Sequence, residues 1–281
     1  MSLLWGIPYL LIKVAVDELS PPVLVFLRTV LAALLLLPYA AATGALSALR
    51  GHWRMVVAFT VLELTGPWLL LTDAETRLSS SVAGLLVAAV PLVAAVLSRI
   101  LGDEDRLDRT RTVGLLVGVA GVAVLLGIDL RGDLWSAAEM GLVVLGYGSA
   151  PLIASRRLSG VPGVAVTAAA LSLTELFYLP FAIANRPDHF PSGKTVSAIV
   201  VLAVACTAVA FLVFFALIGE VGPNRALVIT FVNPAVAVLL GVLLLSEPLT
   251  LGTVLGFPLI LGGCVLATRR SVSAPPPVAE P

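Results

Sequence analysis

Apolar segments, most of them about 16 to 23 residues long, recur along the whole chain between short polar breaks. An α-helix of that length crosses the roughly 30 Å hydrocarbon core of a bilayer. The segments are Leu3–Val16, Pro22–Ala42, Trp53–Thr72, Ser80–Leu101, Thr112–Ile128, Ala137–Ala154, Gly163–Ala184, Val196–Ile218, Arg225–Leu245 and Leu251–Thr268. The pattern predicts an all-α integral membrane protein with ten transmembrane helices. The connections are too short for a soluble domain, so the function is expected to lie within the bilayer.

Composition agrees with this prediction. Charged residues make up 12% of the chain and hydrophobic residues 59%, whereas a soluble domain has about a quarter of its residues charged. The net charge is zero, which argues against a nucleic-acid partner. Cys206 and Cys264 lie inside apolar runs and are interpreted as small hydrophobic residues rather than as a disulfide.

The two ends of the chain carry separate expectations. A helix from Ser2 to Val16 would rise only about 22 Å, so we expect a thinly seated first helix or, preferably, a start that lies upstream. The ending SVSAPPPVAEP, residues 271–281, is Pro-rich and is expected to form a disordered tail.

Basic residues predict the orientation. With the N-terminus in the cytoplasm, four basic residues fall in the outer connections: Arg77, Arg131, Arg186 and Lys194. Eleven fall in the inner connections and tail: Arg50, Arg54, Arg99, Arg106, Arg109, Arg111, Arg156, Arg157, Arg225, Arg269 and Arg270. The asymmetry predicts a multi-pass protein of the cytoplasmic membrane with both termini in the cytoplasm.

Matching spacings in the two halves indicate an internal repeat. Thirteen residues separate Pro91 from Glu104, and also Pro234 from Glu247. Sixteen separate Gly6 from Pro22, and also Gly146 from Pro162. The chain is therefore predicted to be a duplication, with a first five-helix repeat at 1–131 and a second at 132–270. Two copies with an odd number of spans must be inverted across the membrane, which is an architecture of alternating-access transporters.

The opening LLWGIPYLLIKVAVDELSPPVLVFLRTVLAALLLLP and the ending NPAVAVLLGVLLLSEPLTLGTVLGFPLILGG resemble the EamA-like family of the drug/metabolite transporter superfamily. The resemblance covers essentially residues 1–270. It implies efflux or exchange of small metabolites such as amino acids, nucleobase-like compounds, sugars or drugs, through a central cavity with peripheral fifth and tenth helices. The family motif Leu-Gly-Glu reads LGDED after the fourth segment and LSEPL after the ninth, and the first helix is short.

Four ionisable residues lie well inside apolar segments: Lys13, Arg28, Glu63 and Glu175. A charge at the bilayer centre costs at least about 2.5–3.5 kcal/mol, so such residues usually face a cavity or a partner. Arg28 either extends its stem to the headgroups or lines an outer vestibule. Lys13, at the family's Ile-Lys position, either attracts an anionic substrate or neutralises Glu63.

Glu63 and Glu175 are the candidates for proton coupling. A buried carboxyl group that gains and loses a proton can exchange that proton for substrate; the alternative for each is a purely structural link between helices. The repeat places Glu63 opposite Cys206 and Glu175 opposite the Ala33 region, so the two acids are not symmetry mates. Trp68, five residues beyond Glu63, is about 140° away on an ideal α-helix and need not share its site.

Other polar and aromatic residues complete a candidate substrate site: Trp5, Tyr9, Lys13, Tyr147, Ser149 and Asn233. Each of them could instead serve packing. Pro67, Pro91 and Pro234 are predicted to kink their helices and to act in gating. The patterns Gly114-x3-Gly118, Gly252-x3-Gly256 and Gly262-Gly263 predict close helix packing, within the chain or in a homodimer.

An enzyme is disfavoured, because neither His52 nor His189 belongs to a metalloprotease motif and no histidine lies in a span to act as a base. No catalytic residue, metal or cofactor is therefore assigned. The predicted function is secondary transport that exports or exchanges small organic metabolites across the inner membrane by alternating access, with coupling to protons. The alternative is a facilitative, channel-like permease without proton coupling.

Overall fold

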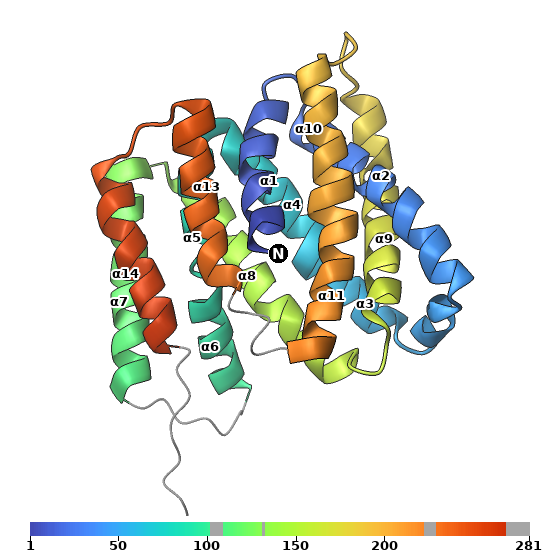
Figure 1. Cartoon of the computed structure of the whole chain (residues 1–281), viewed down its shortest axis with the longest axis horizontal. Helices are drawn as coiled ribbons and strands as arrows, with labels where there is room; N and C mark the ends of the chain where they lie inside the picture. The colour runs from blue at the N-terminus through green and yellow to red at the C-terminus, as the bar shows by residue number, and fades with distance from the viewer. Residues whose placement is uncertain (102–108, 131–132, 222–228, 268–281) are drawn as a thin grey trace, which may run out of the picture.

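All ten predicted segments correspond to a helix or to consecutive helices in the computed structural model, which describes residues 1–101, 109–130, 133–221 and 229–267 (Figure 1). The first half contains α1 (Ser2–Ala15), α2 (Pro21–Ala42), the 3₁₀-helix η1 (Ala45–Leu49), α3 (Trp53–Thr60), η2 (Val61–Thr65), α4 (Gly66–Arg77), α5 (Ser80–Val87), α6 (Val90–Ile100), α7 (Arg109–Leu125) and η3 (Leu126–Leu130). The second contains α8 (Leu134–Arg157), α9 (Gly163–Ala184), α10 (Gly193–Ala203), η4 (Val204–Val209), α11 (Ala210–Val221), α13 (Ile229–Leu245) and α14 (Leu251–Ala267). The predicted tail at 271–281, the repeat boundary at 131–132 and the start of the ninth segment at Arg225 lie outside the described residues.

Seven described stretches are long and apolar enough to cross a membrane: Pro21–Ala42, Trp53–Arg77, Ser80–Leu97, Arg109–Ile128, Leu134–Arg157, Gly163–Ala184 and Gly193–Phe214. Three apolar helices are shorter: Ser2–Ala15, Val232–Leu245 and Leu251–Ala267. The N-terminus of α1 lies near mid-height of the bundle (Figure 1). This position agrees with the predicted short rise of the first helix.

Helices α1, α4 and α13 end, and α5, α8 and α10 begin, at the end of the bundle drawn at the top of Figure 1. We call it the upper end. Since α1 runs towards the upper end and α8, the first helix of the second half, runs away from it, the two halves have opposite orientations. α7 and α14 pack against each other at one edge (Figure 1), as the family resemblance implied for the fifth and tenth helices.

The repeat is also visible in local backbone geometry. The π-helical segments η2 and η4 interrupt the third and the eighth membrane helix, and they begin at Val61 and Val204, 143 residues apart. A Cβ added to Gly6 would collide with Val236, and one added to Gly148 would collide with Val93. The residue of the second half that corresponds to Gly6 is therefore Gly148 rather than the predicted Gly146. The corresponding residues of the two halves, Gly6 and Gly148 or Val93 and Val236, are 142 or 143 positions apart, as η2 and η4 are.

Glycines allow close approach of α7 and α14. A Cβ on Gly263 would collide with the backbone of Gly118, and a Cβ on Gly114 would collide with the backbone at Ala267. A Cβ on Gly262 would meet nothing within 4 Å. The predicted close packing is thus confirmed for Gly263, whereas its neighbour Gly262 faces open space.

Candidate functional site

Arg28 is the cation at the centre of the bundle. Its side chain leaves α2 and is only 7% exposed. Nε donates a hydrogen bond to Oγ1 of Thr207 in η4 (3.0 Å), and the guanidinium carbon lies 3.7 Å from the ring centroid of Trp68 in α4. The interpretation in which Arg28 reaches for the headgroups is wrong, because Thr207 and Trp68 hold the guanidinium inside. Among the described residues only Nε has a protein acceptor, so the terminal nitrogens remain available to a ligand.

Two tyrosines accompany this cation. Tyr9 in α1 is 7% exposed and interacts electrostatically with Arg28. Tyr147 in α8 interacts electrostatically with Arg28, Tyr9 and Glu63. The predicted site residues Tyr9 and Tyr147 therefore both lie near Arg28, and Tyr147 also lies near Glu63. We call Tyr9, Arg28, Glu63, Trp68, Tyr147 and Thr207 the central site.

Glu63 lies on η2, the π-helical segment. Its Oε2 is buried and has no hydrogen-bond partner among the described residues. In α9, Tyr178 donates a hydrogen bond to the carbonyl oxygen of Thr65 (2.7 Å), and Thr174 shares one with the Thr65 hydroxyl (3.0 Å). These hydrogen bonds hold the widened π-helical turn next to Glu63 in place. Such π-helical segments are frequent at functional sites.

The π-segment also explains why Trp68 contributes to the site. The predicted separation of 140° between Glu63 and Trp68 around the helix axis holds for an ideal α-helix. In a π-turn the hydrogen bonds run from residue i to residue i+5, so two residues five positions apart lie on nearly the same side of the helix. Tyr147 accordingly interacts with both side chains. Gly146 permits this approach, because a Cβ there would collide with the carbonyl oxygen of Leu62 in η2.

An aromatic contact is repeated in the other half. Trp5 in α1 packs edge-on against Phe211 in α11 (centroids 5.8 Å, 71°) and tilted against Phe214 (4.8 Å). Trp5 and Tyr147 are 142 residues apart, and Phe211 and Trp68 are 143 apart. The aromatic framework thus follows the repeat, whereas Arg28 and Glu63 belong to the first half alone.

Lys13 does not neutralise Glu63. Its Nζ donates to the carbonyl oxygens of Glu75 (2.7 Å) and Leu78 (2.8 Å) at the end of α4. The ion pairs among the described residues all involve Arg77. Lys13 therefore satisfies the last carbonyl groups of a helix, which is a common use of a cation at a helix C-terminus.

Glu75 is a buried acid that the sequence interpretation missed. It is fully buried, and neither carboxyl oxygen has a hydrogen-bond partner among the described residues. The third segment was predicted to end at Thr72, but α4 continues to Arg77. Helical periodicity was the available signal, because Glu75 lies four residues after Leu71 and three before Leu78, and both leucines are buried.

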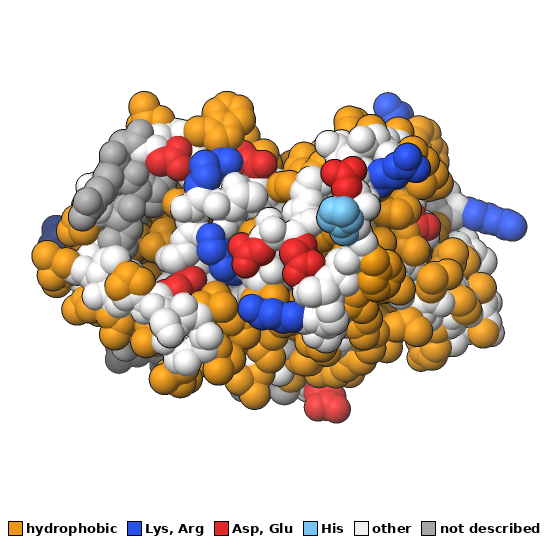
Figure 2. Space-filling view, turned by 90° about the horizontal axis from the view of Figure 1, so that it is seen from above, with side chains coloured by type: hydrophobic (Ala, Val, Ile, Leu, Met, Phe, Trp, Pro, Cys, Tyr) orange, Lys and Arg blue, Asp and Glu red, His pale blue; other side chains and the backbone are white. Residues whose placement is uncertain are grey.

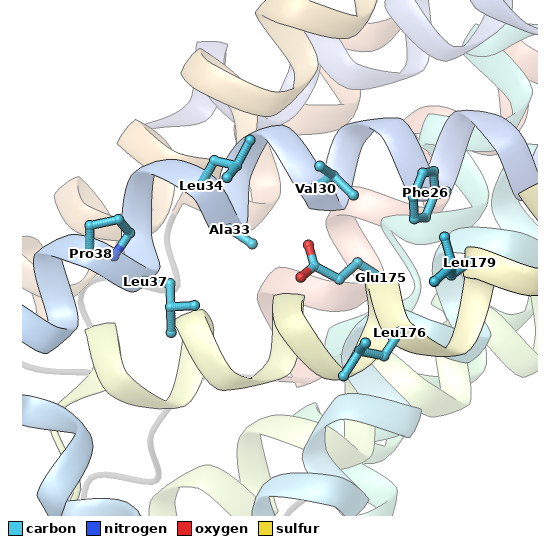
Figure 3. Close-up of a pocket in the computed structure, with 9 residues that line it drawn as sticks. All are labelled: Phe26, Val30, Ala33, Leu34, Leu37, Pro38, Glu175, Leu176 and Leu179. Atoms are coloured by element: carbon cyan, nitrogen blue, oxygen red, sulfur yellow. The ribbon is translucent and has the colours of Figure 1, made fainter.

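The remaining predicted site residues are dispersed. Ser149 donates within its own helix to the carbonyl oxygen of Gly146 (3.0 Å), and the Asn233 backbone closely approaches Gly6. Glu175 faces a groove between α2 and α9 rather than the central site (Figure 3).

The three predicted kink prolines occupy different positions. Pro67 opens α4 directly after η2, Pro91 opens α6 after the break that ends α5, and Pro234 lies inside the continuous helix α13. Near the break between α5 and α6, the buried thiol of Cys264 donates a hydrogen bond to the carbonyl oxygen of Ala88 (3.1 Å). Cys206 and Cys264 form no disulfide with each other.

Charged side chains gather near the middle of the upper end (Figure 2), and three of them link the two halves. Glu18, after α1, accepts hydrogen bonds at the start of α10 from the Ser192 amide (2.7 Å) and hydroxyl (2.5 Å) and from the Thr195 hydroxyl (2.9 Å). These donors, chiefly Ser192, hold the pKa of Glu18 below its ordinary range. Glu247, after α13, accepts from the Ser80 amide (2.7 Å) and from the Ser81 amide (3.0 Å) and hydroxyl (2.5 Å) at the start of α5.

The third link is cationic. Arg77 at the end of α4 forms an ion pair with Glu139 of α8, lies 3.8 Å from the carboxylate of Asp133, and donates from Nε to the Ser136 hydroxyl (2.9 Å). Hydrogen bonds from Ser136, followed by the weaker effect of Arg77, lower the pKa of Asp133. We call the contacts of Glu18, Arg77 and Glu247 the upper latches. All three cross between the first and the second half.

The described residues contain no group of three or more His, Cys, Asp or Glu side chains placed to hold a metal ion. The site offers instead a cation, a carboxyl group, hydroxyl groups and aromatic faces. Such a site suits an organic solute that carries polar and apolar parts.

Comparison with known proteins gives a consistent result. The model of the EamA-like transporter family matches residues 1–127 and 135–269. The chain is 28% identical over 285 residues to the uncharacterized inner membrane transporter YedA of Escherichia coli (strain K12), covering 100% of this chain and 92% of YedA. It is 26% identical over 273 residues to an uncharacterized transporter of Archaeoglobus fulgidus, covering 95% of each. A solved crystal structure superposes with a TM-score of 0.66 at 26% identity, covering 95% of this chain and 94% of the other.

Proposed function

The chain belongs to the EamA-like transporter family and is a membrane transporter rather than an enzyme, and on that premise we propose that it exports or exchanges small organic solutes by alternating access. The observation that carries the proposal is the central site, which takes Arg28, Glu63 and Trp68 from the first half and Tyr147 and Thr207 from the second. A site built between inverted halves is exposed to each side in turn when the halves rock.

The upper latches support a state in which the upper end is shut. Carboxylates at helix N-termini are favourable because they accept bonds from free amides and meet the positive end of the helix dipole. Opening this end would break the contacts of Glu18, Arg77 and Glu247 together. Since all three cross between the halves, rocking of one half against the other is the movement they oppose.

The orientation belongs to the same proposal. The excess of basic residues in the connections at the lower end favours cytoplasmic termini, so the latched upper end faces outward and solute loads from the cytoplasm. YedA, which this chain resembles, is described as an inner membrane transporter, which supports placement in the cytoplasmic membrane. The repeats are proposed to comprise residues 1–131 and 132–270.

Glu63 is the proposed proton-coupling residue. Its buried Oε2 has no protein partner among the described residues, and a carboxyl group without a fixed cation can release its proton when a solute arrives. Arg28 supplies donors for the polar end of the solute, and Trp68, Tyr9 and Tyr147 supply aromatic surface. Amino-acid-like, nucleobase-like and drug-like solutes share this combination of a polar end and a flat or apolar body.

The test uses inside-out vesicles that contain wild type or Glu63→Gln, incubated with a metabolite mixture with and without a proton gradient. Mass spectrometry reports which compounds accumulate. We expect at least one compound to be concentrated by the wild type only when the gradient is present, and by Glu63→Gln under neither condition. Equal, gradient-independent uptake by both proteins would favour the facilitative permease and assign Glu63 to helix packing.

A homodimer is a separate proposal. Gly114 and Gly263 are used inside the chain, in the contact of α7 with α14. Gly262 faces open space and could serve a second protomer. Cross-linking through Gly262→Cys would test it, with Gly263→Cys as the buried control.

A further inference from the structure

The groove between α2 and α9 opens on the side of the bundle and encloses about 270 Å³ (Figure 3). Leu34 of α2 and Leu176 of α9 line it and are each 64% exposed. Both helices are long and apolar enough to span a membrane, so in a bilayer these exposed side chains would face lipid acyl chains. The groove is consequently open to the bilayer.

Among the described residues that line the groove, Glu175 is the one with a polar side chain. Its carboxyl group points from α9 towards Ala33 of α2, and every other lining residue is apolar (Figure 3). Glu175 is the thirteenth of the 22 residues of α9, which places it roughly 15 Å from either helix end. The acid therefore lies near the middle of the span, inside a groove that opens towards lipid.

A carboxyl group in this position needs a compensating partner or must stay neutral. The described residues supply no ion pair to Glu175, because the ion pairs there all involve Arg77. A metal ion fits poorly, since the groove provides one carboxyl group and otherwise carbon, whereas hard cations require six or more oxygen ligands. The partner chemistry that fits is an organic base with an apolar body.

We propose that the groove between α2 and α9 is a binding site for lipophilic amines that enter from the bilayer, with Glu175 as the acid that holds the nitrogen. The amine partitions into hydrocarbon in its uncharged form. The carboxyl proton moves to the nitrogen lone pair, which leaves an ammonium–carboxylate pair with no change in net charge. The alkyl body lies along Val30, Leu34, Leu37 and Leu176. This site is distinct from the central site and does not depend on the proposed transport function.

The groove adjoins the scaffold of the central site. Thr174, which precedes Glu175, shares its hydroxyl hydrogen bond with Thr65 in the π-segment that carries Glu63 (3.0 Å). The groove therefore lies directly beside the contact that fixes this segment.

The test uses the full chain in lipid nanodiscs and dicyclohexylcarbodiimide, a hydrophobic reagent that converts a protonated carboxyl group in hydrocarbon into an N-acylurea. Peptide mass spectrometry measures labelling at Glu175, with Glu175→Gln as the assignment control. The probe is dimethyldodecylamine, and dodecanol is the uncharged control of equal chain length. We expect labelling without the amine and about tenfold protection at ten times the half-protecting amine concentration.

Three results would overturn the proposal. Equal protection by dodecanol would mean that the groove takes hydrocarbon chains without regard to the amine. Absence of labelling in the wild type would mean that the carboxyl group is closed to the bilayer. A Val30→Phe variant, which narrows the groove and leaves the acid in place, should lose protection by the amine; retained protection in that variant would also contradict the site.

Discussion

The latch at Glu247 gives the sharpest prediction about conformational change. The substitution Glu247→Gln keeps the shape of the side chain but replaces one acceptor oxygen by an NH₂ group. The native carboxylate accepts three hydrogen bonds from Ser80 and Ser81, at 2.7, 3.0 and 2.5 Å. An amide can accept through one oxygen only, so at least one bond to a charged acceptor is lost at the start of α5.

The expected magnitude follows from that loss. A hydrogen bond to a charged group contributes about 1.5–3 kcal/mol, and every 1.4 kcal/mol changes an equilibrium constant about tenfold. If the bond exists only while the upper end is shut, Glu247→Gln shifts the equilibrium towards the open upper end by roughly 10- to 150-fold.

The native thiol of Cys206 is the reporter. It is 1% exposed and interacts electrostatically with Arg28, so it becomes reachable only when the interior opens. In a Cys264→Ala background, a membrane-impermeant thiosulfonate is added to each side of the membrane in turn. Labelling of Cys206 from the upper side should be about 10- to 150-fold faster in Glu247→Gln. The matched control is Glu220→Gln, which alters an exposed carboxylate on α11.

Equal labelling rates in Glu247→Gln and wild type would refute this reasoning. It would show that the bonds of Glu247 to α5 persist when the upper end opens. A fall in thermal stability without any change in labelling would assign Glu247 to helix capping alone.

Three further predictions use other contacts. Arg28→Lys should reduce transport at least about tenfold with helix content unchanged, because a lysine cannot reproduce the planar stacking or the Nε bond; wild-type uptake in this variant would remove the guanidinium from the site. Gly263→Ala should lower the free energy of unfolding by about 1–3 kcal/mol through overpacking, whereas Gly262→Ala should leave it unchanged or raise it by about 0.5–1 kcal/mol. The melting temperatures of the two variants in detergent test this difference. Equal shifts in melting temperature would contradict the close contact at Gly263. Hydrogen bonds from Ser192 lower the pKa of Glu18 below its ordinary value of 4.5. The latch formed by Glu18 is therefore intact above pH 4.5 and is lost as the pH falls through the lowered pKa. The ratio of thiol labelling in wild type to that in Glu18→Gln should therefore rise on acidification, and a constant ratio would exclude the latch.

The membrane architecture could be predicted from the sequence because its causes are repetitive and local. Long apolar runs leave few alternatives to a spanning helix, and the matching spacings identified the duplication. The repeat also indicated that Glu175 corresponds to the Ala33 region, but it did not predict that both residues would line one groove where α2 meets α9.

The side-chain arrangement of the central site could not be predicted in the same way. The angle between Glu63 and Trp68 depended on η2, and nothing in a helical-wheel estimate anticipates a π-segment. Arg28 was placed by long-range contacts with Thr207 and Trp68, which only the packed bundle creates. Glu75 was missed because a polar residue after Thr72 looked like the end of the helix, although the helix continues.

The most direct test of alternating access is counterflow with a solute identified by the vesicle screen. Vesicles are loaded with a high concentration of unlabelled solute, diluted into a trace of labelled solute without a proton gradient, and sampled over time. The account predicts that labelled solute accumulates transiently inside the vesicles above its equilibrium level. The reason is that the central site carries unlabelled solute out of the vesicle and then returns with labelled solute bound. A monotonic approach to equilibrium with no overshoot would contradict alternating access and favour a channel-like path.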